Sequence, residues 1–230
     1  MQSIISISKC PICNGKEYIF HISEDGYESA EPCECLIAKW TENWLRHSGI
    51  DYEEYQTKNL GTFLTDCEMA EKMKGNAVKF LADKEATGCG YFGKSGIGKT
   101  HICIAISQEL TKKRKLPHKY FAYRAEIQKL KATMYQDEAY QELMYKWTNC
   151  PILYIDDFLK FATNKDGIQT QDLQIMFDII NSRYINKKIT IFSSELTVKE
   201  ISNVDEALGS RIYAMIEPYG LKCDGKNRRL

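Results

Sequence analysis

The most constraining feature of this 230-residue sequence is the glycine-rich segment Gly-Lys-Ser-Gly-Ile-Gly-Lys-Thr at residues 93–100. It fits the phosphate-binding loop pattern G-x-x-x-x-G-K-[ST] at every constrained position. The residues before it (89–92) predict a short buried strand, and residues 102–110 after it predict an apolar helix. In that context successive backbone N–H groups converge on one anion at the positive end of the helix. The alternative, a chance glycine-rich turn, is disfavoured because pattern and context both match.

The last two residues of the loop carry the most specific chemical expectations. Lys99 places a point charge at the β- and γ-phosphates, and the hydroxyl of Thr100 ligates Mg²⁺. The residues expected around the phosphates are Gly93, Lys94, Ser95, Gly96, Ile97, Gly98, Lys99 and Thr100. The sequence therefore predicts a nucleotide phosphate chain with Mg²⁺ as the ligand.

A second informative stretch, residues 151–158, is an apolar run that contains the paired acids Asp156 and Asp157. It predicts a buried parallel strand that delivers both carboxylates at its C-terminal edge, where ligands bind in such sheets. Asp156 is placed to hold Mg²⁺ through water, and Asp157 is placed to orient the attacking water. Alone the pattern is a weak signal, but about fifty residues after a phosphate loop it becomes a strong one.

Four of the nine cysteines form two close pairs near the start of the sequence. Cys10 and Cys13 have the C-x₂-C spacing of a zinc knuckle, and Cys33 and Cys35 form a tighter C-x-C pair after a hairpin-length segment. Two such pairs satisfy a tetrahedral zinc site, and about 35 residues bury too little apolar surface to fold without one. Four free cysteines in a loop remain the alternative, and His21 is a less favoured substitute ligand.

Charge and hydropathy narrow the class of protein further. The net charge of zero combines −5 over residues 1–60 with +5 over residues 61–230. An acidic first part is a poor grip for nucleic acid and a plausible protein-binding surface. No apolar run approaches the roughly 18 residues of a membrane span. Residues 1–7 are too short for a signal peptide and lack a basic start, so we expect a cytoplasmic protein without a membrane partner.

Strands alternate with helices along the rest of the chain, which predicts an α/β fold with a parallel sheet. We expect a zinc-binding, partner-binding module over residues 1–50 and a nucleotide-binding domain over residues 51–230. The expected strands span about 18–22, 89–92, 119–123, 151–158, 189–192 and 217–222. The expected helices span about 36–47, 67–81, 102–110, 125–147, 173–184 and 198–202, with a last one from 205.

Taken together, these motifs resemble the AAA+ ATPases that load bacterial and phage replicative helicases, the DnaC/DnaI type, and especially phage or prophage members. The resemblance spans nearly the whole chain and rests on residues 93–101, 155–157, 190–197 and 209–213. It implies an AAA+ ATPase with a five-stranded parallel sheet in the order 5-1-4-3-2 and a small zinc module. ATP, Mg²⁺ and Zn²⁺ are the implied cofactors, and His101 joins the implied nucleotide-binding residues.

The same resemblance implies partners. The zinc module would bind the replicative DNA helicase, and the ATPase domain would bind single-stranded DNA. The implied DNA contact is the region 125–147 with Lys129 and Lys131, for which a long packing helix is the alternative. Arg211 would be an arginine finger that completes a neighbouring subunit's ATP site, which requires a homo-oligomer in the ATP state.

Three positions depart from the family pattern. Asp157 stands where many AAA+ proteins have Glu, and the shorter arm suits slow hydrolysis. Glu195 stands where many relatives have a sensor Asn, which leaves Ser194 as the candidate that senses the γ-phosphate. The usual lid helices do not fit after residue 222, so Arg228 and Arg229 are candidates for the second sensor only by elimination.

Three functions from different classes follow. The first is an ATPase that places the replicative helicase on single-stranded DNA at initiation. The second is a transposition-helper ATPase of the IstB type, which shares the core motifs but usually lacks a zinc module. The third is a weakly hydrolysing regulator that binds a host helicase loader or the helicase, an alternative that Glu195 keeps open.

Overall fold

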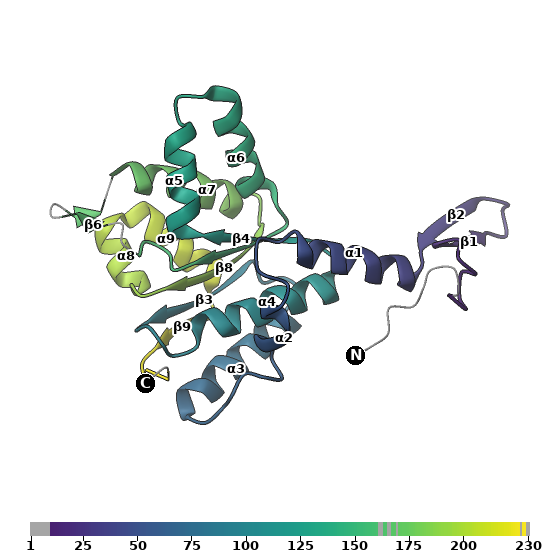
Figure 1. The fold of residues 1–230 in the computed structure, drawn as a ribbon, viewed down its shortest axis with the longest axis horizontal. Helices are drawn as coiled ribbons and strands as arrows, with labels where there is room; N and C mark the ends of the chain where they lie inside the picture. Colours follow the sequence, from purple (N-terminus) through teal and green to yellow (C-terminus); the bar gives the residue numbers. More distant parts are fainter. Residues whose placement is uncertain (1–9, 161–162, 165–166, 169, 226, 229–230) are drawn as a thin grey trace.

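A five-stranded parallel sheet forms the centre of the protein, in a computed structural model that describes residues 10–160, 163–164, 167–168, 170–225 and 227–228. Its strands lie in the order β4-β5-β8-β3-β9 (Figure 1). Their bounds are β3 Gly88–Gly93, β4 His118–Ala122, β5 Ile152–Asp156, β8 Ile189–Ser194 and β9 Gly220–Cys223. Numbered along the chain, this is the order 5-1-4-3-2 that the sequence predicts, so the AAA+ arrangement is confirmed.

Alternation within the strands divides the interior into two apolar cores, one on each face of the sheet. Ile152 and Tyr154 of β5 belong to one core, whereas Leu153 and Ile155 belong to the other. All five residues of β5 are buried, as expected for a parallel strand covered on both faces. Strand β8 lies between β3 and β5, and all three are parallel. The phosphate loop after β3 and the acids at the end of β5 therefore lie at the same edge of the sheet.

Helices cover both faces (Figure 1). On one face lie α3 and α4; on the other lie α7 and α9. The helices of this part are α3 Glu68–Ala82, α4 Lys99–Arg114, α7 Thr170–Ile185, α8 Val198–Val204 and α9 Glu206–Ile216. A two-residue pair of strands, β6 Thr163–Asn164 and β7 Gly167–Ile168, lies between β5 and α7.

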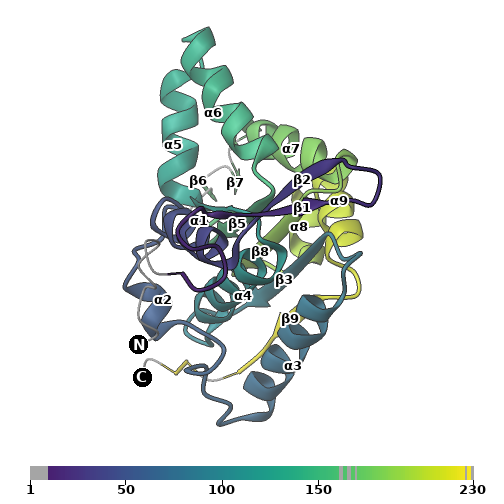
Figure 2. The same ribbon diagram turned by 90° about the vertical axis from the view of Figure 1, so that its right-hand side faces the viewer.

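The region 125–147 is the clearest correction to the sequence-based fold. It is not one helical region but a pair, α5 Tyr123–Thr133 and α6 Asp137–Asn149, which projects beyond the sheet (Figures 1 and 2). A turn separates them, in which Gln136 N donates to Thr133 O at 2.7 Å. Acidic residues then open α6, where the positive end of a helix favours them.

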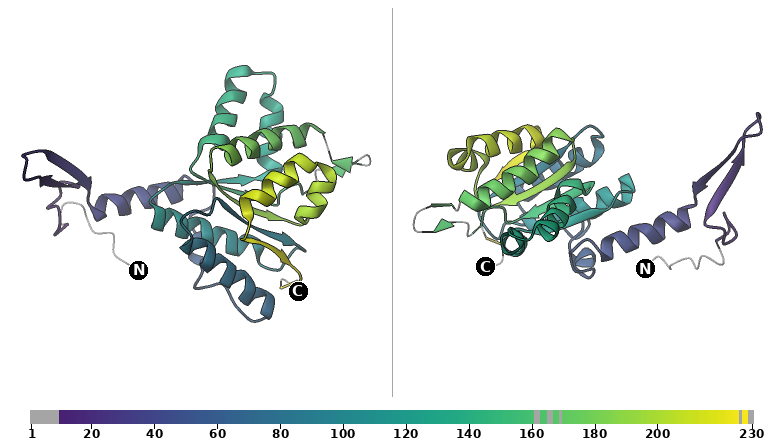
Figure 3. Two further views of the ribbon diagram at one scale, coloured as in Figure 1. Left: turned by 180° about the vertical axis from the view of Figure 1, so that it is seen from behind. Right: turned by 90° about the horizontal axis from the view of Figure 1, so that it is seen from above.

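The first part of the chain extends away from the body (Figures 1 and 3). Strands β1 Tyr18–Ile22 and β2 Glu28–Pro32 form an antiparallel hairpin at the far end of helix α1 Glu34–Arg46. The other end of α1 reaches the body, where Tyr120 N of β4 donates to Ser48 O at 2.8 Å. A short helix, α2 Glu54–Thr57, follows.

Two expectations concern membranes and the start of the chain. Within the described ranges, no helix combines the length and the apolar character that crossing a membrane requires. The expectation about residues 1–7 lies outside the described residues.

Candidate nucleotide site and metal centre

The predicted phosphate loop connects β3 to α4. Three of its glycines have positive φ: 139° at Gly93, 82° at Gly96 and 99° at Gly98. Residues with a Cβ rarely adopt such values, and a Cβ at Gly93 would also collide with the carbonyl of Cys223. The glycines are therefore required by the backbone path, and α4 begins directly after Gly98.

Lys99 lies in the interior of this loop. Its Nζ donates to the carbonyl oxygens of Gly93 at 2.7 Å and Lys94 at 2.8 Å. The residue is only 6% exposed, and burial lowers the pKa of its ammonium. The lysine is thus held within the curve of the loop, where its charge faces the space that a phosphate would enter.

The predicted Mg²⁺ residues lie together at the start of α4 and the end of β5. Thr100 Oγ1 donates to Asp156 Oδ1 at 3.2 Å. Three further hydroxyls donate to the same carboxylate: Tyr120 at 2.9 Å, Tyr154 at 2.5 Å, and Ser193. None of these three was predicted from the sequence, because they come from three different strands. Together they fix the Asp156 carboxylate, an oxygen ligand of the kind Mg²⁺ prefers.

Asp157 lies at the rim of the sheet in a left-handed conformation with φ of 51°. Its Oδ2 is 3.1 Å from Nζ of Lys160, and the same Nζ is 2.8 Å from Glu195 Oε1 at the end of β8. Lys160, then the nearby charge of Lys99 and the hydroxyl of Ser95, lower the pKa of Glu195. Lys160 was not predicted, although it follows Asp157 by one helical turn's length in sequence.

Ser194, the expected sensor, is buried away from the cavity, whereas Glu195 lies near the phosphate loop. The hydroxyl of Ser194 is fully buried, donates to Phe158 O at 2.8 Å and accepts from Leu196 N at 3.1 Å. It therefore stabilises the turn after β5 and does not line the cavity of the phosphate loop. Glu195, in contrast, extends toward the loop through its contact with Ser95.

A cavity of about 490 Å³ lies above the loop. The loop side is formed by Ser95, Gly96, Gly98, Lys99, Thr100 and His101, with Asp157 and Lys160 at one end. The opposite side is formed by Lys58, Thr62, Phe63, Leu64, Asp66 and Arg228. His101 Nε2 lies 3.1 Å from Asn59 O, and its ring packs edge-on against Phe63.

The sequence patterns do not predict that the segment 58–66 contributes to this cavity. Locally it is marked by three apolar residues among polar ones, Leu60, Phe63 and Leu64. Arg228 is also part of the cavity wall, and its guanidinium donates to Leu64 O at 2.9 Å. Arg229, the other candidate for a second sensor, lies outside the described residues.

Arg211 lies on α9, away from this cavity. Its Nε donates to Asn181 Oδ1 at 2.5 Å, and its guanidinium carbon lies 4.7 Å from the centre of the Phe177 ring. It is not among the residues that line the chain's own nucleotide cavity. This position agrees with a residue that acts on a neighbouring subunit, and that role stays a prediction.

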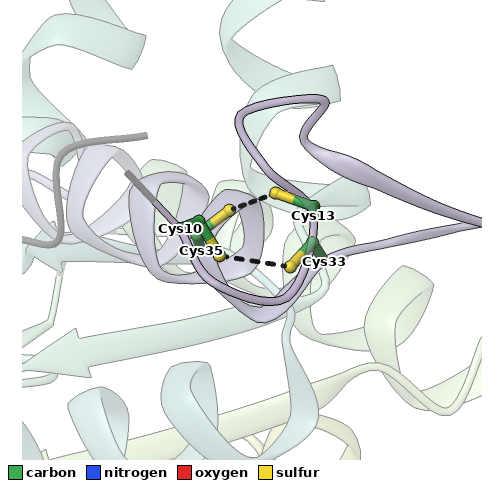
Figure 4. A group of neighbouring side chains, drawn as sticks. All are labelled: Cys10, Cys13, Cys33 and Cys35. Atoms are coloured by element: carbon green, nitrogen blue, oxygen red, sulfur yellow. Dashed lines mark hydrogen bonds between the residues drawn. The ribbon is translucent and has the colours of Figure 1, made fainter. Parts of the chain in front are cut away.

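The four paired cysteines converge at the base of the hairpin (Figure 4). Their sulfur atoms all lie within 4.8 Å of one another, with Cys10 to Cys33 at 3.8 Å and Cys13 to Cys35 at 3.5 Å. Tetrahedral Zn²⁺ with bonds of about 2.3 Å separates its sulfurs by about 3.8 Å. The cysteines therefore fit a zinc ion. His21 is not part of the group; it is exposed and 3.2 Å from Glu31.

The electrostatics of the cysteines agree with a cation site. Backbone N–H groups of Cys13 and Ile12 lower the pKa of Cys10 to about 7, which favours a thiolate. Burial and the neighbouring sulfurs raise the pKa of Cys35 to about 12. A divalent cation would offset this crowding, because thiolates are the species that zinc binds.

The basic residues expected to meet DNA are mostly paired within the protein. Lys131 Nζ lies 2.6 Å from the buried carboxylate of Asp172, and Lys129 Nζ lies 2.7 Å from Glu126. Trp147 is buried, whereas Tyr135 and Tyr145 are 91% and 70% exposed. Arg114, in the basic cluster of residues 111–115, donates hydrogen bonds to the carbonyls of Asp83 and Lys84. It therefore caps the C-terminal end of α3.

Comparisons with known sequences place this geometry in context. The model of the family described as "Bacterial DnaA ATPAse domain" matches residues 65–218. The protein YqaM of Bacillus subtilis (strain 168) is 33% identical over 198 residues, which are 83% of this chain but 62% of that relative. The phage-like element PBSX protein XkdC of the same organism is 28% identical over 205 residues, covering 86% of this chain and 76% of XkdC.

Two solved structures share the fold. The crystal structure of the DnaC helicase loader aligns with a TM-score of 0.63 at 24% identity, covering 75% of this chain and 99% of that one. The replication initiator DnaA bound to AMPPCP and single-stranded DNA aligns with a TM-score of 0.60 at 21% identity, covering 75% of this chain and 51% of that one.

Proposed function

Because the chain belongs to the bacterial DnaA ATPase domain family, we propose that it is an ATP-dependent loader that binds the replicative DNA helicase and places it on single-stranded DNA. One observation carries the nucleotide part of this proposal. Lys99, Thr100 and Asp157 line one cavity, and Thr100 is hydrogen-bonded to Asp156. The aligned DnaC structure is that of a helicase loader, which supports the loading part of the proposal.

The hydrolytic roles follow from the positions of the side chains. Lys99 would neutralise the β- and γ-phosphates, and Thr100 with Asp156 would hold a Mg²⁺ ion, which would offset charge on the phosphate oxygens. Asp157 accepts a hydrogen bond from the attacking water and so orients it for in-line attack. His101 and Phe63 bound the cavity beyond the loop, where the nucleoside would lie.

Arg211 extends the proposal to an assembly. We assign it as an arginine finger that acts on ATP held by the neighbouring copy in a homo-oligomer. A guanidinium supplied in this way raises turnover by roughly 10³–10⁵. Hydrolysis is then slow in the monomer and accelerates only when copies assemble on ATP.

The zinc module supplies the contact with the helicase in this proposal, and the division at residue 50 separates it from the ATPase domain. Its exposed hairpin carries Phe20, Ile22 and Tyr27, which are 64%, 73% and 78% exposed. Single-stranded DNA would meet the α5–α6 pair, where Tyr135 and Tyr145 are available for stacking on bases. These activities belong to the bacterial cytoplasm.

The test combines nucleotide measurements with capture of the partner. Lys99→Ala should lose ATP binding and hydrolysis, whereas Asp157→Asn should bind ATP and lose turnover. The immobilised wild-type protein, loaded with ATP, should retain the replicative helicase from a bacterial lysate. Arg211→Ala mixed with Lys99→Ala should regain ATPase activity, because some interfaces then pair an intact loop with an intact finger.

A second function is favoured by one observation, the Lys160–Glu195 ion pair at the position of the family's neutral sensor. In this alternative the chain is a weakly hydrolysing regulator that binds a host helicase loader or the helicase. Capture of a host loader, with turnover unaffected by Arg211→Ala, would select it. Capture of a transposase would instead select the IstB-type helper.

A further inference from the structure

Lys160 connects Asp157, which lines the nucleotide cavity, with Glu195, which follows β8. Its Nζ lies 3.1 Å from Asp157 Oδ2 and 2.8 Å from Glu195 Oε1. One ammonium therefore holds both the acid assigned to the attacking water and the acid at the position of a sensor. We propose that Lys160 is the γ-phosphate sensor of this chain. The terminal phosphate attracts the Lys160 ammonium away from Asp157, and Asp157 is then free to orient the attacking water. The inference rests on the proposed ATPase function.

The position of Lys160 supports direct contact with the phosphate. It lines the same cavity as Ser95, Lys99 and Thr100 of the loop. Its partner Glu195 interacts with the hydroxyl of Ser95 and with the charge of Lys99. The Lys160 side chain is 23% exposed, so its ammonium is partly accessible in the cavity that the residue lines.

The backbone around Lys160 is fixed by an unusual turn. Asp157 and Leu159 both have positive φ, 51° and 60°, and neither is a glycine. Lys160 N donates to Asp157 O at 2.9 Å, and Phe158 N donates to Ser193 O at 2.8 Å. Phe158 is fully buried and anchors the turn to the sheet. Conformations of this kind persist where the surrounding structure holds them, and they concentrate at functional sites.

The charge balance explains why a cation is needed here. Asp157 lines the cavity and Glu195 shares its Lys160 partner, and either carboxylate would repel a γ-phosphate bound there. A neutral sensor in place of Glu195 would not add this repulsion. The positive charge of Lys160 offsets this repulsion. The ammonium can move from the acids to a phosphate only when a terminal phosphate is present. With a diphosphate, the ammonium stays on the two acids and Asp157 stays occupied.

The experiment compares a triphosphate analogue with a diphosphate. Dissociation constants for AMPPCP and ADP, each with Mg²⁺, are measured by calorimetry on the full chain for wild type, Lys160→Gln and Lys160→Arg. We expect Lys160→Gln to weaken AMPPCP about tenfold, which is about 1.4 kcal/mol, and to change ADP by less than twofold. Lys160→Arg should keep most of the preference for AMPPCP. Lys72→Gln, which breaks an exposed ion pair with Glu68 on α3, is the control and should bind both nucleotides as wild type does.

A second variant separates sensing from a merely structural ion pair. Glu195→Gln removes the acid that competes for the ammonium, so AMPPCP should bind more tightly while ADP is unchanged. Equal losses for both nucleotides in Lys160→Gln, or no loss for either, would overturn the proposal. So would weaker AMPPCP binding in Glu195→Gln. A wild-type protein that binds neither nucleotide would instead refute the proposed function itself.

Discussion

The hairpin module and the ATPase body are stabilised by different physical means. Among the described residues of the module, the buried cluster is made of Cys10, Cys13 and Cys33, with Ile19 and Cys35 partly buried beside it. The body instead has two extensive apolar cores on the two faces of its sheet. The module therefore depends on sulfur chemistry for its fold, and the body depends on side-chain packing.

The difference also separates the tasks that the two regions suit. Phe20, Ile22 and Tyr27 of the hairpin point outward, because a zinc-held fold does not need them inside. In the body, the two cores hold large apolar residues such as Phe121, Trp147 and Phe192, and the nucleotide cavity is lined by charged and hydroxyl groups among others. A surface for a partner and a site for a nucleotide can then change independently.

Removal of zinc is the strongest test of this comparison. A chelator, or Cys33→Ser, should unfold the hairpin module, because a structural zinc contributes roughly 10–16 kcal/mol of folding free energy in such small units. The body should keep its thermal transition, because its apolar cores and not the metal stabilise it. Hydrogen exchange resolved by peptide, with metal analysis at about one zinc per chain, measures both regions in one sample.

Cys67→Ser is the matched control for that experiment. Cys67 is exposed, lies at the start of α3, and its side chain makes no capping hydrogen bond. This variant should retain zinc and the wild-type exchange pattern. If the hairpin of Cys33→Ser stayed protected from exchange, the module would be held by something other than the metal.

The second test makes the same substitution, isoleucine to alanine, once in each of the two regions. Ile179 on α7 is fully buried in the body, whereas Ile22 on β1 is 73% exposed in the module. Ile179→Ala should lower the free energy of unfolding of the body by about 2–5 kcal/mol, since it removes buried apolar volume and leaves a cavity. Ile22→Ala should change stability by less than about 0.5 kcal/mol. Urea denaturation followed by circular dichroism compares them, and equal effects would contradict the comparison.

Local patterns in the sequence were sufficient for the features that lie within a few residues of one another. The phosphate loop, the acids after β5 and the cysteine pairs are of this kind, and the sheet order followed from the family they indicate. The features that were missed join distant segments. Phe63 meets His101, and Tyr120 and Ser193 meet Asp156, across contacts that no local spacing encodes.

Two further misses have a physical reason. The α5–α6 turn was not predicted because polar and aromatic residues continue through it without glycine or proline. Ser194 was favoured as a sensor over Glu195 because an acid near a phosphate is unfavourable in isolation. The compensating charge of Lys160 comes from a separate strand end, so only the folded arrangement shows it.

The third test uses pH to probe a buried contact between helix α2 and strand β4. His118 on β4 lies between Tyr55 and Thr111, with both ring nitrogens at 2.7 Å from a hydroxyl. Burial lowers its pKa from 6.5 to about 3. Between those values the unfolded chain binds the extra proton, so stability should fall as pH falls, by up to about 1.4 kcal/mol per pH unit.

That slope can be isolated from the module. Denaturation is measured from pH 7.5 to 5 in the presence of a chelator, so that zinc release does not contribute. His118→Gln should be less stable at pH 7.5, because it cannot satisfy both hydroxyls in the same geometry, yet it should lose less stability on acidification than the parent. An identical slope in both proteins would show that His118 does not titrate on unfolding.

The smallest predicted effect asks whether the two regions communicate at all. Tyr120 lies where they meet: its N–H donates to Ser48 O at 2.8 Å, and its hydroxyl donates to Asp156 Oδ2 at 2.9 Å. Tyr154 donates to the same carboxylate but lies inside the body. Tyr120→Phe and Tyr154→Phe should each raise the Mg²⁺ concentration for half-maximal hydrolysis about two- to fivefold, because Thr100 and Ser193 still hold Asp156. Removal of zinc should raise this Mg²⁺ concentration in the wild type and in Tyr154→Phe. It should have no further effect in Tyr120→Phe, because the contact path from Ser48 through Tyr120 to Asp156 is then broken. If zinc removal shifts the Mg²⁺ requirement equally in both variants, the coupling does not pass through Tyr120. If it shifts none of the three proteins, the module and the body act independently.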